Sequence, residues 1–299
     1  MVSPSSGSWS AGATRSTAGR DLAVAERSSR GVSSSRMTTK GGEVLFAWLH
    51  LSDIHVGHGD VEHGWDQKLV LEALRVDVAR VLESGKVPQP RAVLVTGDVA
   101  FSGATRKDDE YECASRCLDV VGEAAGLTRQ DIFVIPGNHD VQRNVDQIDK
   151  NVSRLVRALR AGEESVDTAL ADASDRALLE KRQANYLAFA RDFAPACRAS
   201  SSESALWWRY DLAGDGGLCV RLGGLNTALL AADDDQGSLR LGKAQLAHLL
   251  LDPAPGPSTV VMVLTHHPLH WLADEGEVGG WVKAHVQRVM RQDHHHRRR

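Results

Sequence analysis

The 299-residue sequence lacks the features of membrane, secreted and zinc-knuckle proteins. No stretch approaches the roughly 20 apolar residues that a membrane span requires, and the first residues lack the apolar run of a secretory signal. The four cysteines form no Cys-x-x-Cys pair, so their spacing suggests neither a zinc knuckle nor a disulfide framework. These absences favour a reduced, cytoplasmic protein without membrane contact.

The sequence also lacks the net positive charge that is typical of nucleic-acid-binding proteins, since its formal net charge is -4. Residues 1–40 carry six Lys/Arg against two acids, and residues 291–299 carry four Arg against one Asp. The intervening residues 41–290 therefore hold a net charge of about -11. An acidic centre suits a protein that gathers carboxylates around cations better than one that follows a phosphate backbone.

Residues 1–40 are rich in Ser, Gly, Ala and Arg, a composition that buries too little apolar surface to fold. We therefore expect a disordered N-terminal segment over 1–40. A transit peptide has a similar composition. The alternative that we favour is that Met37 is the true initiator.

Five short apolar runs have the length and the nearly continuous apolar character of buried strands. They are Val44–Leu51, Ala92–Thr96, Ile132–Pro136, Leu218–Leu225 and Val260–Thr265. Helical patterns lie between them at Trp65–Ser84, Glu110–Ala125 and Lys243–Leu251. Alternating strands and helices predict an α/β core, which we assign to residues 41–290.

The segment 141–206 breaks this alternation. It is rich in Arg, Ala, Leu and Glu and contains no strand-like run, so we expect a helical insertion that caps the core. Residues 291–299 form an irregular basic tail of His and Arg, and no strand-like run is visible between His285 and that tail.

Polar side chains follow each apolar run at its C-terminal end, where ligands gather in open α/β sheets. They are Asp53 and His55, Asp98, Asn138 to Asp140, Asn226, and His266 with His267. Two residues apart, Asp53 and His55 would point to the same side of an extended backbone. Asp98 follows Gly97, which permits a sharp turn, and one carboxylate with two oxygens can bridge two cations.

Asn138 would add a neutral amide oxygen to this set, and His266 a further nitrogen. Mixed N/O ligands favour Mn, Fe or Zn over the all-oxygen shells that Ca and Mg prefer. Two divalent cations about 3.5–4 Å apart can clamp a phosphate and activate a bridging water. The pattern thus predicts phosphoester hydrolysis by a metal-bridging hydroxide, with His139 placed to protonate the leaving oxygen or to hold a phosphate oxygen.

Structural roles compete with these functional ones. Asp98 and Asn138 could cap the helices that follow them. We interpret Asp140 and His267 as supporting residues, and Arg143 as a candidate contact for a substrate phosphate.

Four blocks of the sequence resemble four of the five signature blocks of the calcineurin-like metallophosphoesterases, in the family's order. The blocks are Asp53-x-His55, Gly97-Asp98, Gly137-Asn138-His139-Asp140 and His266-x-Pro268. The resemblance implies two mixed β-sheets packed as a sandwich and flanked by helices. It also implies that Asp53, His55 and Asp98 hold one metal. The other metal would take Asp98, Asn138 and His266.

The family's fifth block, Gly-His-x-His, is missing from the sequence, where the chain instead runs to His294–His296 and three arginines. Three interpretations remain open. A frameshift or truncation replaced the original C-terminus, the protein is a relative with impaired metal binding, or His294–His296 substitute for the missing ligands.

We therefore expect a dinuclear metallophosphoesterase that acts on a phosphomonoester or phosphodiester, with small substrates such as nucleotides or cyclic nucleotides favoured by the acidic core. The alternatives are a catalytically inactive metal-binding homologue and a nuclease of the kind found in double-strand-break repair, which would bind DNA in a salt-dependent manner.

Overall fold

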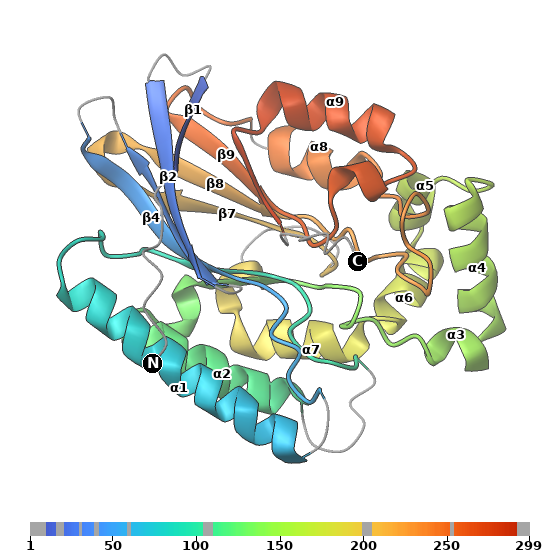
Figure 1. The fold of residues 1–299 in the computed structure, drawn as a ribbon. Coiled ribbons are helices and arrows are strands. Elements are labelled where there is room, and N and C mark those ends of the chain that lie inside the picture. The colour runs from blue at the N-terminus through green and yellow to red at the C-terminus, as the bar shows by residue number, and fades with distance from the viewer. Residues whose placement is uncertain are drawn as a thin grey trace, which may run out of the picture.

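The computed structural model describes residues 10–15, 21–29, 32–38, 42–58, 61–103, 110–198, 205–251 and 254–291. Within them the strands form a six-stranded sheet, β1-β2-β3-β4-β5-β6, and a four-stranded sheet, β10-β9-β8-β7 (Figure 1). The strands are β1 Ser10–Arg15, β2 Asp21–Ser29, β3 Val32–Thr38, β4 Val44–Leu51, β5 Val93–Thr96, β6 Ile132–Ile135, β7 Trp208–Ala213, β8 Cys219–Gly224, β9 Thr259–Leu264 and β10 Arg288–Met290.

Both sheets are mixed. Strands β4, β5 and β6 are parallel, whereas β1 to β4 pair antiparallel. In the second sheet β8, β9 and β10 are parallel and β7 is antiparallel to β8. The predicted fold of two mixed sheets with flanking helices is confirmed.

Alternation of side chains along the strands builds the layers of the sandwich. Leu94 of β5 and Met262 of β9 belong to the apolar core between the two sheets. Their neighbours in sequence point to the opposite faces, where Val95 and Val263 meet the helices. Because these strands are buried on both faces, they are nearly continuous in apolar residues.

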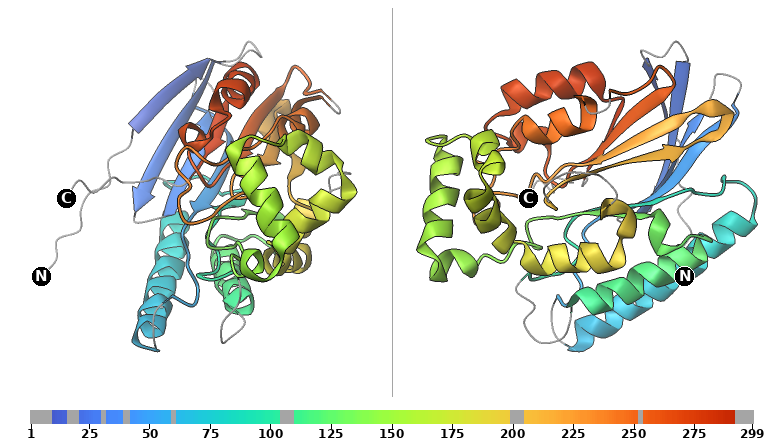
Figure 2. Two further views of the ribbon diagram at one scale, coloured as in Figure 1. Left: turned by 90° about the vertical axis from the view of Figure 1, so that its right-hand side faces the viewer. Right: turned by 180° about the vertical axis from the view of Figure 1, so that it is seen from behind.

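Helices cover the outer faces of both sheets. Figures 1 and 2 show α1 (Val61–Glu83), α2 (Glu110–Ala124) and α7 (Ala184–Phe193) on the outer side of the six-stranded sheet. On the far side α8 (Ala244–Leu251) and α9 (Glu275–His285) cover the four-stranded sheet. No helix in the described part of the chain is both long and apolar enough to cross a membrane.

Within residues 141–206, for which an insertion was predicted, the described part is helical. Besides α7 it contains α3 Val145–Ile148, α4 Lys150–Ala161, α5 Val166–Ala171 and α6 Ala173–Lys181, which lie at one end of the sandwich (Figure 2). Short 3₁₀ turns occur at Arg129–Asp131, Pro195–Arg198, Asp215–Gly217 and Leu269–Trp271.

A buried cation connects this helical segment to the loop after β8. The guanidinium of Arg182 is fully buried and forms two hydrogen bonds with the Asp146 carboxylate, of 2.8 and 2.9 Å. It also donates to the carbonyl oxygens of Leu229 and Ala231. The loop that follows β8 is thereby fixed beside the ends of the strands.

The N-terminal segment differs from its prediction. Residues 10–15, 21–29 and 32–38 form antiparallel strands rather than disordered chain. Strand β3 pairs with β4 and thereby satisfies backbone groups that β4 would otherwise leave open at the edge of the sheet. These strands continue a ladder of backbone hydrogen bonds that starts at β4, which the composition of residues 1–40 does not reveal.

The residues after His285 also differ from their prediction. Residues Arg288–Met290 form β10, parallel to β9, although no strand-like run was visible there. With only three residues and a charged first position, β10 carries too little apolar pattern to be recognised. Residues 292–299, including His294–His296, lie outside the described residues.

Candidate metal centre

The loops after β4 and β5 run side by side at the carboxyl ends of these parallel strands. The Asp53 N–H donates to the Gly97 carbonyl at 3.3 Å, and the His55 N–H donates to the Asp98 carbonyl at 2.9 Å. The loop after β6 contacts the same place, since the His139 N–H donates to Asp98 Oδ1 at 2.9 Å. Polar residues from three separate loops are thus gathered in one place.

Three of these residues have unusual backbone conformations. Asp53, His55 and Asp98 have φ values of 57°, 48° and 54°, and no other non-glycine residue in the described ranges has a positive φ. The extended backbone predicted for Asp53 and His55 is therefore wrong, because β4 ends at Leu51 and the chain turns immediately. Left-handed conformations outside glycine cost about 1–3 kcal/mol each and tend to be retained at functional sites.

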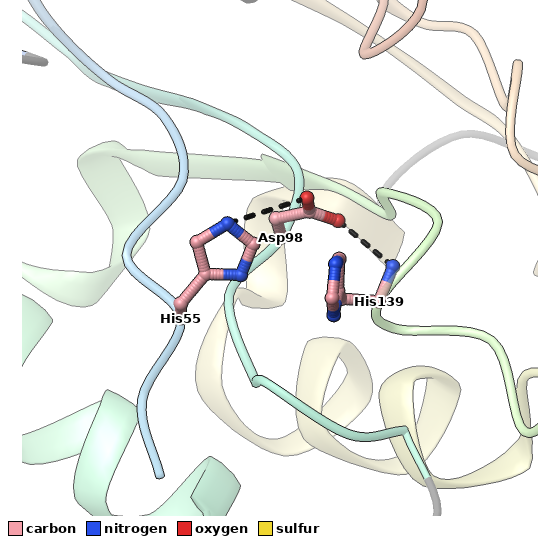
Figure 3. A group of neighbouring side chains, drawn as sticks. All are labelled: His55, Asp98 and His139. Carbon is pink, nitrogen blue, oxygen red and sulfur yellow. Dashed lines mark hydrogen bonds and ion pairs between the residues drawn. The ribbon is translucent and has the colours of Figure 1, made fainter. Parts of the chain in front are cut away.

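Asp98 lies at the centre of the group and is only 3 % exposed. Its Oδ2 lies 3.7 Å from His55 Nε2 and 3.5 Å from His266 Nε2, so one carboxylate oxygen faces two imidazoles. The His55 Nε2 atom is also 3.7 Å from Asp53 Oδ1. Figure 3 shows His55 and His139 in contact with Asp98.

The tautomer of His266 points a nitrogen lone pair at two oxygens. Its Nδ1 is 2.8 Å from the Thr96 carbonyl, which can only accept, so Nδ1 carries a proton. In the neutral ring, Nε2 then presents a lone pair toward Asn138 Oδ1 at 3.0 Å and Asp98 Oδ2 at 3.5 Å. Three electron-rich atoms brought together in a buried place suit a cation among them.

The donor atoms therefore fit a metal. Ligands bound at about 2.1 Å to one cation lie about 3.0–3.5 Å from one another, close to the 3.0–3.7 Å observed here. Burial lowers the pKa of His55, and the charge of Asp98 opposes this only in part. His55 is thus neutral near pH 7, the form that binds metals.

His139 is close enough to the cluster to be counted with it. One potential ligand atom of His55, one of Asp98 and one of His139 lie within 4.8 Å of one another. The His139 Nδ1–H donates to the Phe101 carbonyl at 2.8 Å, which leaves Nε2 to meet a substrate or a cation. The prediction assigned His139 to catalysis alone, and the geometry permits either role.

Asp140 supports the cluster from behind. Its fully buried carboxylate accepts hydrogen bonds from the backbone N–H groups of Val99, Ala100 and Gly137 and from the Tyr111 hydroxyl. Burial, followed by the charge of Asp98, raises the pKa of Asp140 to about 6, although the backbone hydrogen bonds oppose the rise. The carboxylate thus connects the loops after β5 and β6 to helix α2.

The remaining predicted residues lie in different surroundings. His267 is 1 % exposed, and its backbone N–H donates to Thr227 Oγ1 at 3.0 Å. Arg143 pairs at 3.3 Å with Asp233, a fully exposed side chain, rather than with the cluster. The Asn226 side chain pairs with that of Gln183.

Two residues near the centre were missed by sequence reasoning. Thr96, whose carbonyl orients His266, ends an ordinary apolar run, and Tyr111 lies in the first turn of an ordinary amphipathic helix. Their partners come from distant parts of the chain, so no local pattern marks them.

Comparison with curated proteins gives no match. The sequence profile described as calcineurin-like phosphoesterase matches residues 48–291, which contain the whole cluster, the second half of β4 and strands β5 to β10. The chain therefore belongs to the calcineurin-like phosphoesterase family, whose members are metal-dependent phosphoesterases that generally bind two divalent metals.

Proposed function

We propose that the protein hydrolyses a phosphomonoester or phosphodiester with two divalent cations, Mn, Fe or Zn, held at this cluster. The observation that carries the proposal is the position of Asp98 Oδ2, which faces the imidazoles of His55 and His266 at once. Asp53 and His55 would hold one cation and Asn138 and His266 the other, with Asp98 between them. Bound there, the cations would supply an activated water and positive charge for the phosphate oxygens.

The chain's own groups have distinct tasks in this proposal. Asp98 would set the separation of the two halves of the site, and its burial strengthens the attraction of the carboxylate for cations. The His139 Nδ1–H donates a hydrogen bond to the Phe101 carbonyl. Its Nε2 is therefore the atom that would contact the leaving oxygen or a phosphate oxygen.

The main alternative is a catalytically impaired homologue, because each cation has only three of the proposed ligands among the described residues. Strand β10 runs parallel to β9, and the Met290 carbonyl accepts from the Thr265 N–H at 2.8 Å, one residue before His266. His294–His296 follow this strand in sequence but lie outside the described residues.

Small phosphoesters such as nucleotides or cyclic nucleotides remain our preferred substrates, and a repair-type nuclease is the weaker alternative. The acidic residues 41–290 would repel a long polyphosphate. The candidate phosphate contact Arg143 is paired with Asp233, which leaves it less suited to a backbone phosphate.

An assay with bis(p-nitrophenyl) phosphate and Mn²⁺, combined with metal analysis, tests the proposal. Asp98→Asn should lower turnover by at least about 1000-fold and reduce the content of both metals, since one carboxylate serves both. His139→Ala should leave metal content near that of the wild type and slow the reaction by about 100-fold or more. Asp77→Asn, a half-exposed carboxylate on α1 that pairs with the exposed Arg80, is the control.

The outcomes separate the alternatives. Stoichiometric metal without product would indicate an inactive homologue. Unchanged metal content in Asp98→Asn would disprove the bridging role.

A further inference from the structure

The ring of Phe101 lies beside the cluster and contacts three histidines. Its centroid is 5.2 Å from that of His139, 6.1 Å from that of His55 and 4.4 Å from that of His58. The residue is half-buried and lies next to a group of charged and polar residues. None of the roles assigned above uses the ring.

Backbone hydrogen bonds fix Phe101 relative to the catalytic residues. Its N–H donates to the Val56 carbonyl at 2.8 Å, and its carbonyl accepts from His139 Nδ1. The ring is therefore held by the same loop that orients His139, the residue proposed to serve the leaving group. A flat apolar surface is thus maintained at a constant place beside the phosphate site.

His58 adds a second ring from another loop. Its ring meets Phe101 edge to face, with an interplanar angle of 77°, and its side chain is exposed. The His58 N–H donates to the His55 carbonyl at 3.1 Å, so this ring too is tied to a cluster residue. Two rings from two loops, each anchored to a cluster histidine, thus meet at nearly a right angle beside the cluster.

We propose that Phe101 and His58 form a stacking site for the planar ring of a phosphoester substrate, so that the enzyme prefers nucleotide esters to esters of small aliphatic alcohols. This inference rests on the proposed phosphoesterase function and names its substrate class. Aromatic side chains gain binding energy from every nucleobase because each base has a π-face. The Phe101 ring carries no hydrogen-bonding group, so we expect little discrimination among bases.

A second aromatic side chain offers a direct competitor. The ring of Trp271 lies 5.7 Å from that of His267, on the His266 side of the cluster. A base that stacked there would make Phe101 irrelevant. Trp271 is therefore the matched position against which the proposal is tested.

The experiment compares two phosphodiesters that share the p-nitrophenolate leaving group: thymidine 5′-(p-nitrophenyl phosphate) and methyl p-nitrophenyl phosphate. The readout is the ratio of their kcat/KM values in Mn²⁺, in which losses common to both diesters cancel. We expect the wild type to prefer the thymidine ester by about tenfold or more. Phe101→Leu should remove most of this preference, His58→Ala part of it, and Trp271→Leu little.

A wild-type ratio near one, an unchanged ratio in Phe101→Leu, or a loss of preference confined to Trp271→Leu would overturn the inference. If neither diester is hydrolysed, the proposed function fails separately. Stacking is then measured by calorimetry, with thymidine 5′-monophosphate and methyl phosphate as ligands of the Mn²⁺-loaded protein. Tighter binding of the thymidine nucleotide that Phe101→Leu weakens would support the site, and equal affinities would exclude it.

Discussion

Asp140 accepts four hydrogen bonds inside the protein, and this one carboxylate holds together the loops that present Asp98 and His139. Three of the donors are backbone N–H groups, which persist when a side chain is exchanged. Only the Tyr111 hydroxyl comes from a side chain, and it comes from α2, outside the sequence blocks that mark the family. A substitution of Tyr111 therefore tests the role of this carboxylate while the carboxylate and its three backbone donors stay in place.

Tyr111→Phe should lower the free energy of unfolding by about 1.5–3 kcal/mol, the usual size of a buried hydrogen bond to a charged group. It should also weaken Mn²⁺ binding several-fold, because the loop that carries Asp98 loses one of its restraints. Urea unfolding and metal titration measure the two effects.

Tyr186→Phe is the control for this substitution. Both tyrosines are buried and both contact the ring of Phe189, but no hydrogen bond of the Tyr186 hydroxyl is seen in the described part of the chain. Equal effects of the two substitutions would show that the hydrogen bond to Asp140 contributes nothing.

Single residues differ in how well their positions could be predicted. Asp98, Asn138 and His266 were recognisable because each follows a buried apolar run, and parallel strands bring their ends together. The left-handed backbone of Asp53 and His55 was not, since it results from hydrogen bonds with the neighbouring loop after β5. Phe101 could not be assigned a role either, because its neighbours are far apart in sequence.

At the scale of elements, the turn after β5 requires close approach of several backbones. Gly97 has φ 91°, and a Cβ there would lie 2.7 Å from both His266 Nδ1 and the Gly137 nitrogen. Gly137 is equally confined, because a Cβ added there would lie 2.1 Å from Asp98 Oδ1. The two glycines allow strands β5, β6 and β9 to deliver their ligands to one point.

Gly97→Ala should therefore destabilise the protein by more than about 3 kcal/mol and abolish stoichiometric Mn²⁺ binding, since strain in the backbone is added to steric overlap with a ligand. Gly85→Ala is the matched control: this glycine also has a positive φ, of 64°, but no atom would lie within 4 Å of the added methyl group. It should cost only about 1 kcal/mol and leave metal binding intact. Thermal unfolding and metal titration distinguish the two, and a similar loss in both variants would refute the steric explanation.

Strands with continuous apolar character were predictable to within a few residues, as β4, β5, β6, β8 and β9 show. The missed strands all lack that character. In strand β7, Trp208–Ala213, every position after the buried tryptophan is partly or fully exposed, and β10 has only three residues. Such strands form because a neighbouring strand offers a ladder of hydrogen bonds, which is information that a local pattern does not contain.

At the scale of the whole molecule, the cluster connects the two sheets. Asp53, His55, Asp98 and Asn138 follow strands of the six-stranded sheet, whereas His266 follows β9 of the four-stranded sheet. A cation bound by both sets would resist separation of the layers. Metal binding should therefore be linked to global stability rather than to a local loop.

Mn²⁺ at about 100 times its dissociation constant should stabilise the protein by about 2.7 kcal/mol for each bound cation, which corresponds to a rise in Tm of roughly 5 °C per cation for a chain of this size. His266→Ala should remove the part of this rise that comes from the cation held by Asn138 and His266, because it deletes the ligand from the second sheet. His270→Ala, an exposed histidine four residues away, is the control and should keep the full rise. A full rise in His266→Ala would mean that the metal does not join the two sheets.

Whether two cations share Asp98 can be seen by anomalous diffraction from crystals of the protein grown with Mn²⁺. We expect two anomalous peaks, each within about 2.0–2.3 Å of the Asp98 carboxylate, with Asp53 and His55 beside one peak and Asn138 and His266 beside the other. Mn²⁺ peaks located elsewhere, with none bonded to Asp98, would contradict a dinuclear centre at this cluster.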